Sequence, residues 1–192
     1  MSLVTAAKSS FEPLPAGSYS AVCVSMIDVG TMTGPFGSQQ KLWIEWECDE
    51  LDSSGNRYRV GKFYTNSISA KSKLREHLES WRGKQFTRDE LSGFSLLTIL
   101  GKPCMLAVSN TTKDDKTYSN VDAVSKLAKG MQAIEPSEPT LAFDVDDPDQ
   151  DVLDRLPEFI RKIIEKAPEY NGRSQPVKAV PAPSAPTDDV PW

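Results

Sequence analysis

The order in which two hydrophobic periods follow one another constrains the fold of this chain more than any other feature. Five segments have the composition or the two-residue alternation of strands: residues 18–29, 41–48, 57–65, 102–109 and 117–124. Between the third and the fourth, residues 69–82 place Leu74, Leu78 and Trp81 at helical spacing. This order predicts a mainly β domain. It matches the OB-fold, a five-stranded, partly open Greek-key barrel, although other small β domains share it.

The second strand segment alternates most cleanly. Its apolar face, which we expect in the core, consists of Leu42, Ile44, Trp46 and Cys48. Its polar face consists of Lys41, Trp43, Glu45 and Glu47. An exposed Trp43 needs a reason, either stacking on a base or cover by the C-terminal region. The two glutamates would repel phosphate, which counts against the whole face as a path for DNA.

Turn and cap signals separate these segments. Residues 31–40 and 110–116 are rich in turn-forming residues, and we expect loops there. Ser69 is the predicted N-cap of the helix and Gly83 its stop. Residues 87–90 have the pattern of a capping box, which predicts a second short helix.

Beyond residue 130 the chain becomes acidic and rich in proline. Within residues 150–166, one stripe of an amphipathic helix consists of Val152, Leu156, Phe159, Ile160 and Ile163. Because Pro157 suits only a first turn, we expect the helix to begin near Leu156. The stripe would pack on the barrel or, alternatively, on a second copy in a homodimer.

These signals divide the chain into four parts. Residues 1–16 form an N-terminal arm, and residues 17–130 the OB-fold domain. Residues 131–171 form an acidic linker with the amphipathic helix. Residues 172–192 are rich in Pro, Ala and Ser, and we expect them to be disordered because they cannot bury a core.

The net charge of −5 conceals an asymmetry. Residues 1–130 carry 16 Lys and Arg against 14 Asp and Glu, whereas residues 131–192 carry 6 against 13. A mildly basic body with an acidic tail suggests a polyanionic partner and a tail that mimics or competes with it. Solubility alone is the alternative explanation.

Several function classes are excluded by what the chain contains. His77 is the single histidine, and the three cysteines form no CxxC pair, so we expect no metal site, no cofactor and no enzyme activity. The sequence has no run of 18 apolar residues and no signal-peptide pattern, which predicts a protein of a reducing cytoplasm without a membrane partner. The cysteines are expected in the core.

The last five residues give the sharpest functional signal. Two acids, an aliphatic residue, a proline and a terminal aromatic follow one another as Asp188, Asp189, Val190, Pro191 and Trp192. The ring can fill an apolar pocket of a partner, while the carboxylates meet its Arg or Lys side chains. We therefore expect this tail to bind a partner protein.

At these residues the chain resembles a known family. The tail is similar to that of bacterial single-stranded-DNA-binding proteins, with Trp192 where those have Phe, and the family's tails dock replication and repair enzymes. The body resembles the single-stranded-DNA-binding proteins of bacteriophage replication and recombination modules. The stretches that carry this likeness are GSYSAVCVSMIDVG, KSKLREHLESWRGKQFTRDEL, LLTILGKPCMLAV and LPEFIRKIIEKAPEY. The resemblance implies a phage protein that works in the cytoplasm of a bacterial host.

The third strand is the best candidate for the DNA path, because binding single strands needs cations and aromatic faces. Strict alternation would bury Lys62, so we expect a bulge at Gly61. Tyr58, Val60 and Phe63 would then face the core. The outward basic row with its aromatic ring would consist of Arg57, Arg59, Lys62 and Tyr64.

Further candidates come from neighbouring elements. Trp43 joins them from the second strand, and the two loops that flank an OB-fold groove supply the rest. The loop residues are Phe36, Lys41, Lys113, Lys116 and Tyr118. The sequence thus predicts a protein that binds single-stranded DNA without sequence preference and recruits partners through its tail. The alternative is a phage adaptor that binds no DNA and works through the tail alone.

Overall fold

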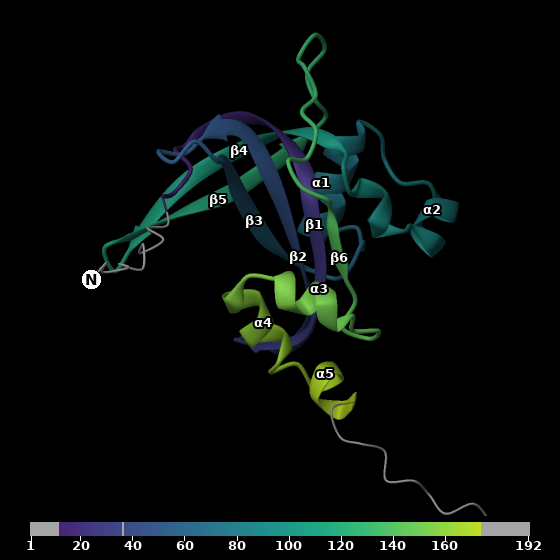
Figure 1. Cartoon of the computed structure of the whole chain (residues 1–192). Coiled ribbons are helices and arrows are strands. Elements are labelled where there is room, and N and C mark those ends of the chain that lie inside the picture. Colours follow the sequence, from purple (N-terminus) through teal and green to yellow (C-terminus); the bar gives the residue numbers. More distant parts are fainter. Residues whose placement is uncertain (1–11, 36, 174–192) are drawn as a thin grey trace, which may run out of the picture.

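The computed structural model describes residues 12–35 and 37–173. Its six strands are β1 (Gly17–Gly34), β2 (Gly37–Leu51), β3 (Arg57–Thr65), β4 (Pro103–Lys113), β5 (Lys116–Ser125) and β6 (Leu141–Phe143). Its helices are α1 (Lys73–Arg82), α2 (Arg88–Gly93), α3 (Gln150–Arg155), α4 (Glu158–Ile164) and α5 (Pro168–Arg173), with the 3-10 turn η1 (Leu96–Ile99). The predicted mainly β architecture is confirmed (Figure 1).

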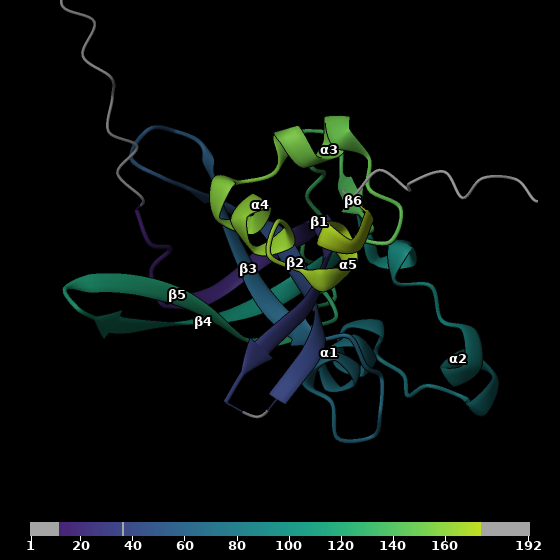
Figure 2. The same cartoon turned by 90° about the horizontal axis from the view of Figure 1, so that it is seen from below.

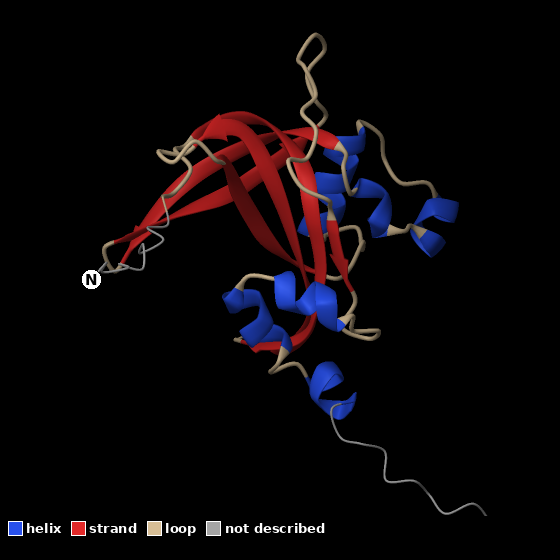
Figure 3. Cartoon of the chain, viewed as in Figure 1, coloured by secondary structure: helices blue, strands red, loops and turns tan. Residues whose placement is uncertain are grey.

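The strands form one curved sheet in the order β3-β2-β1-β4-β5, with neighbours antiparallel. The short β6 adds to β1 in parallel. The path of paired strands ends at β3 and β5, so the sheet is open rather than closed (Figure 3). All five predicted strands and the intervening helix are present.

Both long hairpins extend further than the sequence predicted. β1 and β2 stay paired to Gly34 and Gly37, within the segment expected to be a loop. β4 and β5 stay paired to Lys113 and Lys116, on either side of a two-residue turn whose φ angles of 51° and 60° are positive. Positive φ at both central residues matches the twist of a hairpin, so the pairing can continue to the tip.

The inner face of the sheet packs against α1. The predicted core face of β2 is confirmed, since Leu42, Ile44, Trp46 and Cys48 are all buried. From α1, Leu74, Leu78 and Trp81 complete this core. The helix begins after Ser72, whose side chain accepts from Arg75 N, and not at the predicted Ser69. Its predicted stop at Gly83 and the capping box of Thr87 and Glu90 are confirmed.

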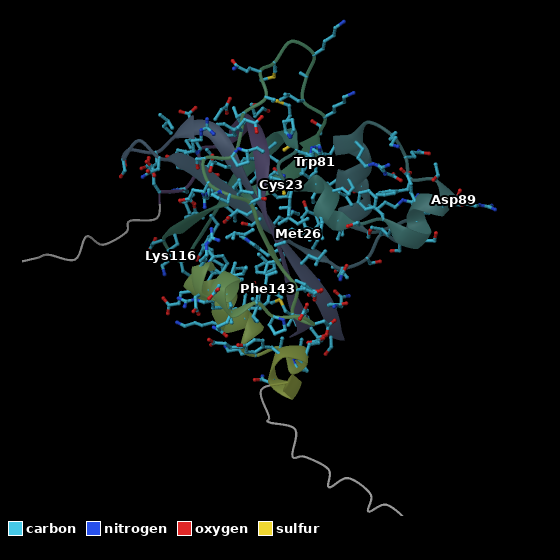
Figure 4. The ribbon with its side chains drawn as sticks, turned by 45° about the vertical axis from the view of Figure 1, so that its right-hand side comes forward. Cys23, Met26, Trp81, Asp89, Lys116 and Phe143 are labelled. Atoms are coloured by element: carbon cyan, nitrogen blue, oxygen red, sulfur yellow. The ribbon has the colours of Figure 1, made fainter. Side chains whose placement is uncertain are left out.

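The C-terminal segment covers the outer face of β1. Here Ile27 and Val29 pack with Phe143, Leu156 and Ile160 in a second core. Figure 4 labels Trp81 in the inner core and Phe143 in the outer one. Within residues 131–171, the segment expected to hold an acidic linker and an amphipathic helix, the structure has β6 and the helices α3, α4 and part of α5.

The amphipathic helix is divided at Leu156 and Pro157 into α3 and α4. α4 begins where the proline predicted, whereas α3 was not expected as a separate helix. Leu156 and Ile160 are buried and Val152 and Ile163 partly buried, so the stripe packs on the sheet. Within the described residues, no helix is long and apolar enough to cross a membrane.

Candidate nucleic-acid interface

The outer faces of β2 and β3 form the candidate interface. β3 alternates regularly through Gly61, because Trp43 pairs with Phe63, Glu45 with Gly61 and Glu47 with Arg59 without a shift. The expected bulge at Gly61 is therefore wrong. The outward residues of β3 are Arg57, Arg59, Gly61 and Phe63, and the inward ones are Tyr58, Val60, Lys62 and Tyr64.

Tyr64 does not face outward as predicted. It is buried at 3% exposure, its ring meets that of Trp46 edge-on, and its hydroxyl lies 2.7 Å from Nδ1 of His77. The other ring nitrogen of His77 lies 3.1 Å from the Asp122 carbonyl, to which it must donate. Nδ1 therefore accepts from the Tyr64 hydroxyl. Tyr64 joins β3 to α1 and cannot stack on a base.

Lys62 also points away from the arginines. It lies half-buried where β3 approaches β5, and its Nζ donates to the Val121 carbonyl at 2.7 Å. Burial lowers the pKa of this ammonium group. Lys62, for which we expected a bulge, thus connects β3 to β5 across the open side of the sheet. The outward basic row therefore consists of Arg57 and Arg59 alone.

Three aromatic rings gather on the outer face, and we call them the aromatic cluster: Trp43 of β2, Phe63 of β3 and Phe159 of α4. The Trp43 ring lies 4.7 Å from Phe63 and 5.4 Å from Phe159, centroid to centroid. Phe63 is 37% exposed and Phe159 49% exposed, whereas Trp43 is half-buried between them. Trp43 is therefore partly covered by the C-terminal region, which is the alternative to base stacking that we considered for it.

Gly61 makes this arrangement fit. A Cβ at Gly61 would lie 2.1 Å from Cζ2 of Trp43, so the indole ring lies directly against the β3 backbone. Only a residue without a side chain allows this approach. Trp43 supports the cluster, and Phe63 and Phe159 present the accessible aromatic surface.

Arg57 and Arg59 hold a buried carboxylate at the other end of the same face. Glu47 is fully buried, 3.0 Å from Nη1 of Arg57 and 3.3 Å from Nη2 of Arg59. Ser137 donates to it through its N–H at 3.0 Å and its hydroxyl at 2.6 Å. Burial alone would raise the pKa of Glu47, but the hydrogen bonds from Ser137 and Arg57 outweigh burial and lower it.

The predicted repulsion between this face and phosphate is thereby reduced. Glu47 is neutralised by two arginines, and burial raises the pKa of Glu45 against the opposing effect of Arg59. Arg59 also pairs with the exposed Glu138 at 2.9 Å. Exposed pairs of this kind are worth about 0–1 kcal/mol, so phosphate can replace Glu138 at little cost.

Arg57 and Arg59 line a groove that also has several acidic residues in its lining. It has a volume of about 1010 Å³ and runs between the end of the β2–β3 hairpin and residues 135–138. Its lining includes the carboxylates of Glu12, Asp52 and Glu135. These acidic residues make the groove unfavourable for phosphate groups.

The other predicted residues lie apart from the aromatic cluster or at its edge. Lys41 precedes Trp43 by two residues and lies on the same face, where its Nζ donates to the Thr65 hydroxyl at 2.8 Å. Lys113 and Lys116 face each other at the tip of the β4–β5 hairpin, and Tyr118 on that hairpin is 48% exposed. The hairpin extends beyond the rest of the sheet (Figure 2). Phe36 and the tail residues Asp188 to Trp192 lie outside the described residues.

Phe63 and Phe159, the two exposed rings of the aromatic cluster, were not among the residues predicted from the sequence for this interface. Phe63 was assigned to the core through the mistaken bulge, although plain alternation would have turned it outward. Phe159 was taken as one member of the apolar stripe, yet it is the member left exposed. Its position at the edge of the stripe was the available signal.

In the part of the chain that the structure describes, no group of three or more His, Cys, Asp or Glu side chains could hold a metal ion. Cys23, Cys48 and Cys104 are buried and unpaired, as expected for core residues. Burial raises the pKa of the Cys48 thiol to about 12, which removes its nucleophilic form at neutral pH. No protein-family model matches the chain, and a comparison with curated proteins finds no significant match.

Proposed function

We propose that this chain is an OB-fold protein that binds single-stranded DNA without sequence preference, in phage replication or recombination. The strand order and the helix between β3 and β4 support the fold assignment. The bond from Lys62 to β5 supports it further, because β3 and β5 flank the open side of such a barrel.

The aromatic cluster is the observation that carries this proposal. OB-folds bind oligonucleotides across the face of the second and third strands, where successive bases stack on aromatic rings. Phe63 and Phe159 present exposed rings at this face, beside the supporting Trp43. Their contacts make no hydrogen bonds to base edges, which accounts for binding without sequence preference.

Cations on both sides of the cluster supply the sequence-independent attraction to phosphate. Lys41 lies at one end of the face, and Arg57 and Arg59 lie at the other. The hairpin lysines Lys113 and Lys116 can contact a strand that continues past the sheet, as the flanking loops of OB-folds do.

The tail forms the second part of the proposal. Its two aspartates, the terminal carboxylate and Trp192 suit a basic, apolar pocket on a replication or recombination protein. Trp192→Ala should therefore abolish co-purification of such a protein with the full chain while single-stranded-DNA binding stays unchanged. Loss of DNA binding in this variant would contradict a division of labour between body and tail.

Substitutions of the exposed rings test the DNA site. Phe63→Ala and Phe159→Ala should each weaken binding to oligo-dT by about 1–3 kcal/mol, or roughly 5-fold to 150-fold, because each removes a stacking surface. Leu97→Ala is the matched control, since Leu97 is 55% exposed in η1, away from this face. If Phe63→Ala and Phe159→Ala bind oligo-dT as tightly as the wild type and the control do, the outer face is not the site. The alternative function, an adaptor that works through its tail alone, would then be favoured.

A further inference from the structure

A cleft with apolar walls opens between β6 and η1. Its volume of about 380 Å³ lies within the range of pockets that bind ligands. Its apolar lining consists of Met26, Leu42, Leu96, Leu97, Ala142 and Phe143. Figure 4 labels Met26 of β1 and Phe143 of β6. Leu97 is 55% exposed, so a ligand with an apolar group would remove a large side chain from water here.

β6 is an edge strand beside this cleft. It pairs with β1 alone, and no backbone hydrogen bond joins it to another segment of the described chain. The backbone N–H and C=O groups that point away from β1 are therefore free to pair. Ala142, the central residue of β6, is exposed. An edge of this kind can accept an extended peptide as an additional strand.

Unpaired negative charge surrounds the same cleft. The carboxylates in its lining are those of Asp28, Asp144, Asp147 and Asp149. Within residues 12–35 and 37–173, no Lys or Arg side chain lies within ion-pair distance of any of them. Burial raises the pKa of Asp28, and the neighbouring charges of Asp144, Asp146 and Glu169 raise it further. Cationic side chains of a ligand would relieve this repulsion.

Charge decides among the possible occupants of the cleft. A nucleic acid is repelled by the carboxylates. A second copy that paired through its own β6 would bring the same carboxylates opposite one another, because a two-fold interface uses the same surface on both subunits. A basic partner segment is the occupant whose charge complements the cleft.

We propose that this cleft binds an extended segment of a partner protein, in which Lys or Arg residues flank an apolar side chain. The segment would pair with β6 as an added strand, so its backbone supplies affinity and its side chains supply specificity. The apolar side chain would contact Met26 and Leu97, and the cations would pair with Asp144 and Asp147. The site uses neither the aromatic cluster nor the tail, so it goes beyond the DNA-binding function and does not depend on it.

Titration of the full chain with an acetylated, amidated peptide, Lys-Arg-Leu-Arg-Lys, followed by heteronuclear NMR, tests the proposal. The amide signals of residues 96–97 and 141–144 should shift together, whereas those of the aromatic cluster should not. A peptide with glycine in place of leucine should bind about tenfold more weakly, because it lacks the apolar group. The acidic peptide Glu-Asp-Leu-Asp-Glu should not bind. N-methylation of two successive peptide bonds should also prevent binding, since one of the two N–H groups must face β6.

Substitutions in the chain locate the contacts. Leu97→Ala should weaken binding of the basic peptide about tenfold, because it removes apolar area from the cleft. Asp147→Asn should weaken binding about two- to fivefold, as expected for one exposed ion pair. Asp151→Asn is the matched control, because it removes the same charge from α3, outside the lining of the cleft.

Four results would overturn the proposal. The first is a set of shifts confined to other acidic parts of the chain, such as the groove beside Glu12 and Glu135. The second is equal binding of the N-methylated peptide, which would exclude strand addition. The third is an equal effect of Asp147→Asn and Asp151→Asn. The fourth is a dimer that excludes the peptide, which would make a second copy the occupant. Because the experiment contains no DNA, its failure leaves the DNA-binding proposal untouched.

Discussion

At the scale of single residues, Gly61 determines where the largest ring of the outer face lies. The sequence suggested a bulge at this position, because strict alternation would bury Lys62 and a glycine inside a strand often marks a bulge. Only the structure shows why a glycine is needed there, because the neighbour that requires it, Trp43, lies on another strand. The prediction that Lys62 faces outward was wrong for a similar reason, because the partner of its ammonium group, the Val121 carbonyl, lies on β5.

Gly61→Ala should therefore displace Trp43 and disturb the aromatic cluster. We expect a loss of about 1–3 kcal/mol in the free energy of unfolding, as for overpacking, together with weaker binding to oligo-dT. Urea denaturation and a DNA titration measure the two effects. Gly34→Ala is the matched control, because a Cβ at Gly34 meets nothing within 4 Å. Equal behaviour of the two variants would show that the ring does not depend on Gly61.

His77 makes the stability depend on pH. Burial lowers its pKa below the ordinary value of 6.5, with Lys62 and Lys73 acting in the same direction. The unfolded chain therefore binds a proton more readily than the folded one. As the pH falls below about 6.5, this difference removes stability, by up to about 1.4 kcal/mol per pH unit until the folded pKa is reached.

Urea unfolding at pH 7.5, 6.5 and 5.5 checks this effect against His77→Gln, which lacks the titrating group. The variant should be less stable than the wild type at pH 7.5, because the hydrogen bonds to Tyr64 and Asp122 are disturbed. The gap should narrow toward pH 5.5, since only the wild type loses stability through protonation of residue 77. A constant gap across the three pH values would mean that His77 does not titrate in this window.

At the scale of elements, periodicity predicted that a C-terminal helix forms but not where it packs. The stripe and Pro157 predicted α4 correctly, because both signals are local. The sequence did not reveal that α4 lies beside Trp43, or that β6 extends the sheet with three residues, because these contacts join distant segments. The exposed polar face expected for β2 is consequently half covered.

Two adjacent residues of α4 test its double role. Ile160 is fully buried in the outer core, whereas Phe159 is 49% exposed in the aromatic cluster. Ile160→Ala should lower the free energy of unfolding by about 2–5 kcal/mol. Phe159→Ala should lower it by about 1 kcal/mol or less and act mainly on DNA affinity. Thermal unfolding measures the stability of both variants, and sedimentation measures their mass in solution. A change of sedimenting mass in Ile160→Ala would show that the helix lies at a dimer contact instead.

At the scale of the whole molecule, the order of strands and helix along the chain was predictable, and the residues of the candidate interface were predictable in part. Alternation along β2 identified the face that carries Trp43, and the positions of Arg57 and Arg59 on that face were also anticipated. Tyr64 was not, because its inward orientation follows from the register of β3 with β2. The pairing of Arg57 and Arg59 with the buried Glu47 and Ser137 joins residues up to 90 positions apart, which no local pattern indicates.

The affinity of the full chain for oligo-dT and for a duplex of equal length, measured against salt concentration, tests the central claim most directly. We predict tight binding to oligo-dT whose log K falls with log salt by about 0.7 for each phosphate contact. The duplex should bind at least about tenfold more weakly, because its stacked bases cannot reach Phe63 and Phe159. Equal affinity for both DNAs, or no binding to oligo-dT at low salt, would contradict a single-stranded-DNA site on this face.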